Sequence, residues 1–291
     1  VAQHARRPPL ALLDKIECKI DSLLASDIIE PVEEYSPWVS PLVAVLKDNG
    51  EIRLCVDMRR ANLAIKRESH LMPTFEDFLP RLKEARVFSR LDIKDAFHQL
   101  ERDESCRQIT TFISHKGMFR YKRLMFGLSN ASEVFQKIVE QMLAGCPNAM
   151  NYIDDILVYG KNEEEHDAAL AKVMDKLKAR NVLLNHKKCI FRVSEVVFLG
   201  HHISGTGIRP AEEKLSALKS FRAPQTVEEL RSFLGLVTYV GRFLPDLATA
   251  TAALRKLTHA GEKFRWEQEH ENAFQKVKRL ICDLKTLRYF D

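Results

Sequence analysis

Short stretches of alternating apolar and polar residues recur along the chain, and they predict strands joined by tight turns. Residues 149–153 and 156–159 form two such stretches around the pair Asp154-Asp155, and Gly160 ends the second stretch. Aspartate is favoured in two-residue hairpin turns because it tolerates positive φ. The pattern therefore predicts a hairpin whose tip carries two adjacent carboxylates. These carboxylates either only form the bend or also bind divalent cations through their oxygen atoms.

A second acidic strand end precedes this hairpin in the sequence. Residues 87–93 alternate like a strand and place Asp92 near its end, where a sheet exposes functional groups. If the two strands lie side by side, Asp92 joins Asp154 and Asp155 in a cluster of three carboxylates. Such a cluster repels itself unless cations are present. Two-metal phosphoryl-transfer sites use clusters of this kind.

Two further strand-like stretches, 42–47 and 52–57, are separated by a turn that contains Asn49-Gly50, a strong hairpin signal. Lys47 and Arg53 flank the turn, and on pattern alone they are solvent-facing charges. The alternation also predicts a strand over 195–204, followed by a glycine-containing turn and a return strand.

Helical periodicity dominates the remaining segments. A predicted helix begins at Asn130 and ends before Gly145, and Asn162 caps a second helix over 162–180. Residues from 210 to about 290 are helical throughout, with a capping box at 226–229. The helix after this box places four residues on one face, namely Arg231, Gly235, Thr238 and Tyr239. A glycine at the centre of that face either permits close approach of a large ligand or packs against another helix.

Composition limits the alternatives. A chain of 291 residues with 45% hydrophobic content forms one large domain or two modules, and no apolar run approaches the ~18 residues of a membrane span. Residues 161–291 carry 23 basic and 17 acidic side chains, against 22 and 23 in residues 1–160, and a basic half suits contact with phosphate backbone. Six scattered cysteines without a Cys-x-x-Cys pair indicate a reducing compartment. One zinc set with unusual spacing remains an alternative: His186, Cys189, His201 and His202.

Five segments resemble motifs A to E of reverse transcriptases, in the same order and with similar spacing. They are LDIKDAFHQ (91–99), LMFGLSNA (124–131) with Phe135-Gln136, YIDD (152–155), KCIF (188–191) and FLGH (198–201). The segments SPWVSP (36–41) and LRSFLGL (230–236) are similar to gypsy-type LTR retrotransposons in particular. Ser132 departs from the family, which usually has proline there, but both residues are tolerated in the first turn of a helix.

The resemblance implies an α+β fold, the right-hand polymerase, with an antiparallel-sheet palm, fingers and a helical thumb. Residues 1–207 would form the fingers and palm, and 208–291 the thumb and the start of a connection to an RNase H domain that this chain lacks. The chain would be part of a longer pol polyprotein. We expect it to be intracellular and cytoplasmic, within virus-like particles in some stages.

The resemblance also implies a reaction, which is the addition of deoxynucleotides to a primer 3′-hydroxyl on an RNA or DNA template. Asp92 and Asp154 would bind two Mg²⁺ ions (Mn²⁺ being an alternative) with help from the Ile93 carbonyl, and Asp155 would complete the negative cluster. The partners would be a template–primer duplex, dNTP substrates and other pol domains or a second copy, and no membrane.

The same resemblance assigns binding residues. Those for the nucleotide are Lys47, Arg53, Asp95, Ala96, Phe97, Phe126, Gly127 and Lys188. Those for the primer and template are Tyr152, Phe198, Leu199, Gly200, Arg231, Gly235, Thr238 and Tyr239. Phe97 would be the steric gate that excludes a ribose 2′-hydroxyl, and Lys188 the acid for pyrophosphate. Their alternatives are a core phenylalanine and a solvated lysine.

Two other classes of function compete with this interpretation. A polymerase-like scaffold that binds RNA or protein without catalysis is disfavoured, because all three aspartates and the aromatic gate are present. A palm-fold cyclase is disfavoured by the segments that resemble a primer grip and a thumb, which a cyclase does not need.

Overall fold

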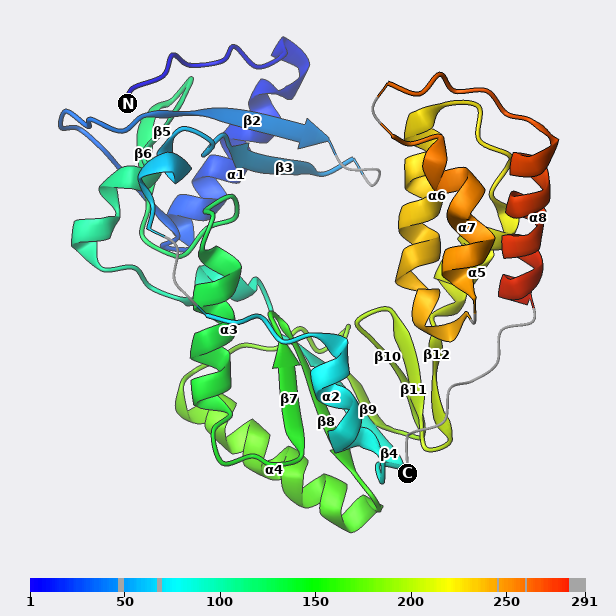
Figure 1. Ribbon diagram of the computed structural model, residues 1–291. Coiled ribbons are helices and arrows are strands. Elements are labelled where there is room, and N and C mark those ends of the chain that lie inside the picture. Colours follow the sequence, from blue (N-terminus) through cyan, green and yellow to red (C-terminus); the bar gives the residue numbers. More distant parts are fainter. Residues whose placement is uncertain (47–49, 67–69, 245, 260, 283–291) are drawn as a thin grey trace. The chain divides into compact units, whose positions relative to one another are not determined.

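The computed structural model describes residues 1–46, 50–66, 70–244, 246–259 and 261–282 (Figure 1). Lys47 lies outside these ranges. The chain divides into two compact units, each built from separate stretches of sequence. The first unit contains Val1–Pro73, Leu91–Ile156 and Ala171–Cys189, and the second contains Thr74–Arg90, Leu157–Leu170 and Ile190–Asp291. The division at residue 207 stays a prediction.

The first unit contains a five-stranded sheet in the order β1-β6-β5-β2-β3. Its strands are β1 (Ile29–Pro31), β2 (Ser40–Leu46), β3 (Ile52–Val56), β5 (Phe112–Ser114) and β6 (Gly117–Tyr121). The predicted pairing of 42–47 with 52–57 is confirmed, because β2 and β3 are antiparallel and Val45 faces Arg53. Helix α1 (Leu13–Ala25) contacts this sheet through its apolar face, which buries Ile16, Ile20 and Leu23.

A second sheet carries the acidic strand ends. Its order is β7-β8-β4-β9, with β7 (Ala149–Tyr152), β8 (Asp155–Gly160), β4 (Val87–Asp92) and β9 (Ile190–Val193). Residues 156–158 in the middle of β8 are fully buried, as expected for an inner strand of a covered sheet. Helix α3 (Ala131–Met142) packs on β7, and α4 (Glu163–Ala179) follows β8 in the sequence.

Helix starts agree only partly with the sequence pattern. The side chain of Asn162 accepts a hydrogen bond from the N–H of Glu165 at 2.9 Å, which confirms the predicted cap. Helix α3 begins directly after Asn130, as predicted, but the predicted side-chain cap is wrong, because Asn130 makes no capping bond and its ψ of 5° is outside the extended range of a cap residue.

The second unit contains a three-stranded sheet in the order β10-β11-β12. Its strands are β10 (Glu195–Phe198), β11 (His201–Ser204) and β12 (Gly207–Pro210). The single strand predicted over 195–204 is wrong. Leu199 and Gly200 have φ values of +50° and +73°, so the chain reverses there and Phe198 pairs with His201.

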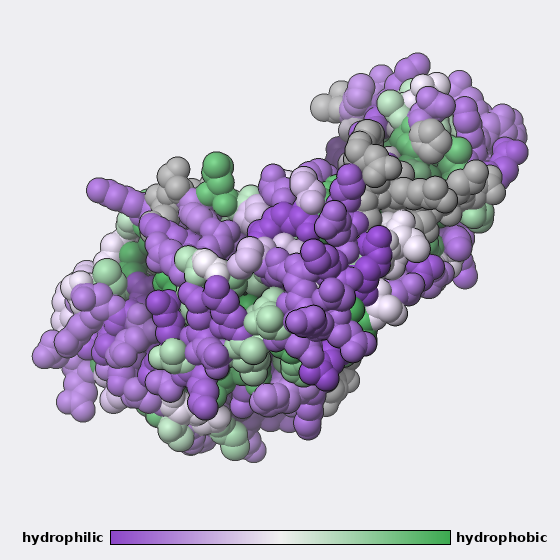
Figure 2. Space-filling view, turned by 90° about the horizontal axis from the view of Figure 1, so that it is seen from below, coloured by the Kyte–Doolittle hydropathy of each residue, from purple (hydrophilic) through white to green (hydrophobic). Residues whose placement is uncertain are grey.

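The C-terminal helices are α5 (Glu212–Ser220), α6 (Val227–Tyr239), α7 (Leu247–Lys256) and α8 (Gln268–Cys282). Thr226 caps α6 as predicted, since its hydroxyl accepts from the N–H of Glu229 at 3.2 Å. Phe233 of α6 is fully buried and lies 4.8 Å from Phe274 of α8 between ring centroids. None of the described helices is long and apolar enough to cross a bilayer, and hydrophilic side chains cover most of the face in Figure 2.

Candidate active site

The turn between β7 and β8 carries the two adjacent carboxylates. Ile153 and Asp154 form the turn, and Asp155 begins β8. Ile153 has a φ of +52°, a left-handed conformation that β-branched residues rarely adopt. The bend therefore lies one residue earlier than the pair Asp154-Asp155, and its strained position is an isoleucine.

The end of β4 meets the tip of this hairpin. The N–H of Ile93 donates a hydrogen bond of 2.9 Å to the carbonyl of Asp154, and β4 and β8 are neighbours in the sheet. Asp92, Asp154 and Asp155 are all half-buried. The structure thus brings the two acidic strand ends together, as the sequence predicts.

The segment before β9 contacts Asp92 through its backbone and through two side chains, and the N–H of Asn185 donates to the carbonyl of Asp92 at 2.8 Å. Lys188 Nζ lies 3.5 Å from Asp92 Oδ2, and the N–H of Asp92 points to Cys189 Sγ at 3.4 Å. The Lys188 side chain is 65% exposed, so its ion pair stabilises the fold little. The lysine is therefore free to exchange Asp92 for another anion.

The donor atoms suit a hard divalent cation, because carboxylate and carbonyl oxygens are the ligands that Mg²⁺ prefers. Across the described ranges, however, no three Asp, Glu, His or Cys side chains form a group that could hold a metal ion. Asp92, Asp154 and Asp155 thus supply suitable chemistry on adjoining strand ends, and their side chains have to turn toward a shared ion to bind it. The zinc set that includes His201 is not assembled in this part of the chain.

Gln136 stabilises the hairpin turn through hydrogen bonds. This side chain of α3 is fully buried. Its Oε1 accepts from the N–H of Ile153 at 2.6 Å, and its Nε2 donates to the carbonyl of Asn151 at 3.0 Å and to Glu140 Oε1 at 2.7 Å. Gln136 lies in motif B, and its role was not predicted from the sequence, although a glutamine inside an apolar helix face is a signal of a buried polar contact.

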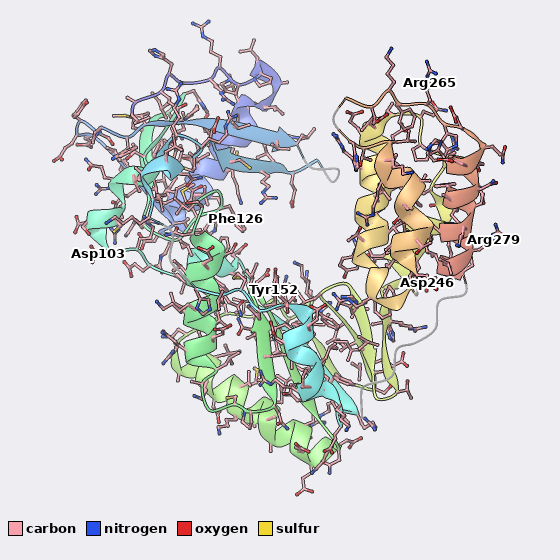
Figure 3. All side chains as sticks on the ribbon, viewed as in Figure 1. Asp103, Phe126, Tyr152, Asp246, Arg265 and Arg279 are labelled. Carbon is pink, nitrogen blue, oxygen red and sulfur yellow. The ribbon has the colours of Figure 1, made fainter. Side chains whose placement is uncertain are left out.

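Aromatic residues and an arginine gather beside the strand end. Phe97 is 7% exposed, and its ring centroid lies 4.8 Å from Phe126 and 5.4 Å from Phe135. Phe126 is 50% exposed, and the Arg53 guanidinium lies 5.3 Å above its ring, within the range of a cation–π interaction. Figure 3 labels Phe126 ahead of α3 and Tyr152 at the end of β7. The structure therefore places Arg53, Phe126 and Phe97 in one chain of contacts.

Two other residues predicted to bind the nucleotide, Asp95 and Gly127, have positive φ values. Asp95 has a φ of +46° and precedes the buried Ala96. Gly127 has a φ of +96°, and its carbonyl accepts from Asn62 Nδ2 at 2.8 Å. Asn62 Oδ1 in turn accepts from the N–H of Ser129 at 3.0 Å. Asn62 thus fixes the loop before α3, a role that sequence analysis missed because the two segments are 65 residues apart.

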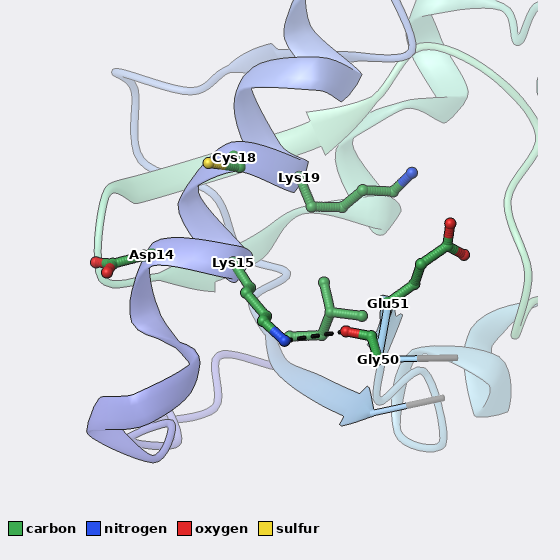
Figure 4. Close-up of a pocket in the computed structure, with 7 residues that line it drawn as sticks. Asp14, Lys15, Cys18, Lys19, Gly50 and Glu51 are labelled. Atoms are coloured by element: carbon green, nitrogen blue, oxygen red, sulfur yellow. Dashed lines mark hydrogen bonds between the residues drawn. The ribbon is translucent and has the colours of Figure 1, made fainter. Parts of the chain in front are cut away.

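A pocket of about 500 Å³ lies beside the β2–β3 hairpin (Figure 4), and none of the described residues that line it is a predicted site residue. Lys15 of α1 donates a hydrogen bond of 3.0 Å to the carbonyl of Gly50 there. This bond ties α1 to the end of the hairpin on which Arg53 sits.

The predicted face of α6 is partly open. Arg231, Gly235 and Thr238 are exposed. A Cβ built at Gly235 meets no described atom within 4 Å, so the alternative of helix packing through this glycine is wrong for the described part of the chain. Arg231 Nη2 donates to the carbonyl of Thr258 at 3.2 Å.

Tyr239 ends the same face but has a partner within its own unit. Its hydroxyl donates to the carbonyl of Leu199 at 2.6 Å, at the turn that Phe198 precedes. Phe198 itself is buried, with its ring 6.0 Å from that of Phe78.

The family model for reverse transcriptase (RNA-dependent DNA polymerase) matches residues 45–203, which include motifs A to E. The chain belongs to the reverse transcriptase family. It is 31% identical over 293 residues to the retrovirus-related Pol polyprotein from transposon 412 of Drosophila melanogaster, and 30% identical over 285 residues to the transposon Tf2-3 polyprotein of Schizosaccharomyces pombe. These alignments cover 98% and 97% of the chain but only 24% and 21% of the relatives.

Solved structures show the same fold. The foamy viral protease-reverse transcriptase in complex with double-stranded DNA matches 100% of this chain and 61% of its own, with a TM-score of 0.90 and 24% identity. Its complex with an RNA/DNA hybrid matches 100% of this chain and 39% of its own, with a TM-score of 0.88 and 24% identity. The predicted α+β polymerase fold is thus confirmed. Membership of the gypsy-type branch of the reverse transcriptase family stays a prediction.

Proposed function

We propose that the chain is an RNA-directed and DNA-directed DNA polymerase that copies retrotransposon RNA into DNA. One observation carries the proposal: the Ile93–Asp154 hydrogen bond joins the acidic end of β4 to the acidic tip of the β7–β8 hairpin. This arrangement occurs in a chain of the reverse transcriptase family, in which the two segments are motifs A and C.

Asp92 and Asp154 would hold two Mg²⁺ ions, with the Ile93 carbonyl as a further ligand and Asp155 adding negative charge. When bound, the ions would activate the primer 3′-oxygen and neutralise charge on the triphosphate and the leaving pyrophosphate. Lys188 would then leave Asp92 and donate a proton to pyrophosphate. The 3.5 Å ion pair supports this role, because it puts the ammonium group beside the carboxylate at which the reaction occurs.

The contacts among Arg53, Phe126 and Phe97 support a nucleotide site. Arg53 would bind the triphosphate, and Phe126 would pack against the nucleotide with its exposed ring face. Phe97 is held by two other rings, so it cannot yield easily to a 2′-hydroxyl. The contacts that make it a core residue would therefore also make it a rigid gate.

A template–primer duplex would lie along α6. The open surface at Gly235 and the exposed Arg231 support this position, and the structural neighbours were solved with double-stranded DNA and an RNA/DNA hybrid. Each phosphate that a basic side chain neutralises would contribute a slope of about −0.9 in log K against log salt.

The test is Mg²⁺-dependent dNTP incorporation on a primed RNA template. A binding scaffold would retain duplex affinity without incorporation, and a cyclase would consume nucleotides without a primer. With labelled RNA in a hybrid, the 291-residue chain should extend the DNA and leave the RNA uncut. Metal-dependent RNA cleavage would show that a nuclease activity resides in this chain.

A further inference from the structure

We propose that Tyr239 is a positioning residue, whose hydroxyl latches α6 onto the Leu199–Gly200 turn and holds that turn in shape. The inference rests on the proposed function, in which this turn grips the primer. It assigns to Tyr239 an action through the turn in place of direct contact with the duplex.

The turn has a shape that needs support. Leu199 and Gly200 are consecutive left-handed residues, with φ values of +50° and +73°. Glycine adopts this conformation readily, but leucine does so at a cost. The Tyr239 hydroxyl donates to the carbonyl of Leu199 at 2.6 Å, so the hydrogen bond acts on the strained residue itself.

Gly200 leaves room for this contact. A Cβ added at Gly200 would lie 2.1 Å from the Tyr239 hydroxyl oxygen and 3.1 Å from the ring carbon that carries it. The first distance is far shorter than a van der Waals contact, and the second is only somewhat shorter than most such contacts. A side chain at position 200 and a hydroxyl at position 239 therefore exclude each other.

Two neighbouring side chains contact the ring of Tyr239. His201 stacks on it with a centroid distance of 5.2 Å and an interplanar angle of 8°, and Lys214 Nζ lies 5.8 Å from its centroid. His201 is itself held against Phe75 at 4.0 Å. A tyrosine clamped in this way cannot turn its hydroxyl toward another partner without leaving the stack.

The latch joins two elements that would grip the same duplex. Arg231 and Gly235 lie on the face of α6 that Tyr239 ends, and Leu199 and Gly200 form the turn that would hold the primer end. A hydrogen bond between them fixes the position of α6 relative to the Leu199–Gly200 turn. Loss of the bond should therefore affect the chemical step at the primer end more than affinity for the duplex.

The experiment is a double-mutant cycle with Tyr239→Phe and Gly200→Ala. For Tyr239→Phe we expect the single-turnover rate constant at saturating dNTP to fall about 3- to 10-fold, the effect of one hydrogen bond, with the duplex Kd within about twofold of wild type. Gly200→Ala should lower the single-turnover rate constant by a larger factor in the wild-type background than in the Tyr239→Phe background, because removing the hydroxyl removes the 2.1 Å clash. The strain of alanine at positive φ is common to both backgrounds and cancels.

Tyr35→Phe is the matched control, since Tyr35 is 85% exposed and should behave as wild type. Equal costs of Gly200→Ala in both backgrounds, with a wild-type rate for Tyr239→Phe, would overturn the latch. A raised duplex Kd with an unchanged rate constant would instead make Tyr239 a direct contact. A rate that falls only with the folded fraction would reduce it to a structural role. If wild type shows no incorporation, the proposed function fails. The melting temperatures of wild type, the two single variants and the double variant then still test whether the Tyr239 hydroxyl and position 200 interact.

Discussion

Gln136→Leu should disable the candidate active site without removing any of its carboxylates. The substitution keeps the volume of the side chain close to its original value but removes three hydrogen bonds, of which one goes to the strained residue Ile153. A hydrogen bond contributes about 0.5–1.5 kcal/mol net, and a buried group left without its partner costs about 1–3 kcal/mol. We therefore expect the free energy of unfolding to fall by about 2–4 kcal/mol.

Activity should fall further than stability explains. A non-glycine residue in the left-handed region stores about 1–3 kcal/mol, and without Gln136 the turn is free to release that strain. Asp154 would then move away from the end of β4. Because about 1.4 kcal/mol corresponds to tenfold in rate, we expect the rate constant for nucleotide addition to fall at least about tenfold.

The assay is single-turnover nucleotide addition by folded protein, with melting curves measured in parallel. Gln141→Leu is the control, because Gln141 is on the same helix and exposed. A folded Gln136→Leu variant that adds nucleotides at the wild-type rate would refute the reasoning, since the turn would then keep its shape without the glutamine.

Three further predictions follow from the site and its surroundings. Phe97→Val should lower the ratio of kcat/KM for dNTP over rNTP by removing the ring held against Phe126 and Phe135, and an unchanged ratio would exclude the gate. Gly235→Leu should weaken duplex binding and leave the melting temperature near wild type, because the position is open and leucine is a good helix former, whereas a sharp drop in melting temperature would contradict an exposed face. Burial chiefly, and the charge of Arg242 secondarily, lower the pKa of His201 from 6.5 to about 4. The folded state therefore resists protonation, so stability that is full above pH 6.5 should be lost toward pH 4, by up to about 3 kcal/mol, and urea titrations should show a smaller loss for His201→Phe.

The sequence predicted those features that depend on local pattern. Alternation of apolar residues located β4, β7 and β8, with Asp92 at the end of β4 and Asp154 in the turn between β7 and β8. The meeting of these acidic ends was predicted only on the condition that the strands are neighbours, and the sheet order meets that condition. It did not predict the reversal at Leu199, because a leucine with positive φ has no local signature and is sustained here by Tyr239, which lies 40 residues away.

The polar contacts that support the site could not be predicted from the sequence either. Gln136 and Ile153 are 17 residues apart, and Asn62 and Gly127 are 65 apart. Such pairs are set by how helices and loops pack, and a single sequence contains no direct record of that packing. The cap at Asn130 failed for a related reason, because capping needs an extended backbone as well as a suitable residue.

The most direct test of the central claim is primer extension on an RNA template by the wild-type chain and by Asp154→Asn, with and without Mg²⁺, alongside duplex binding. The account predicts extension by wild type only with the metal ion, no measurable extension by the variant, and similar duplex affinity for both. Extension by Asp154→Asn at a rate near wild type would contradict the claim that the tip of the β7–β8 hairpin is the catalytic centre.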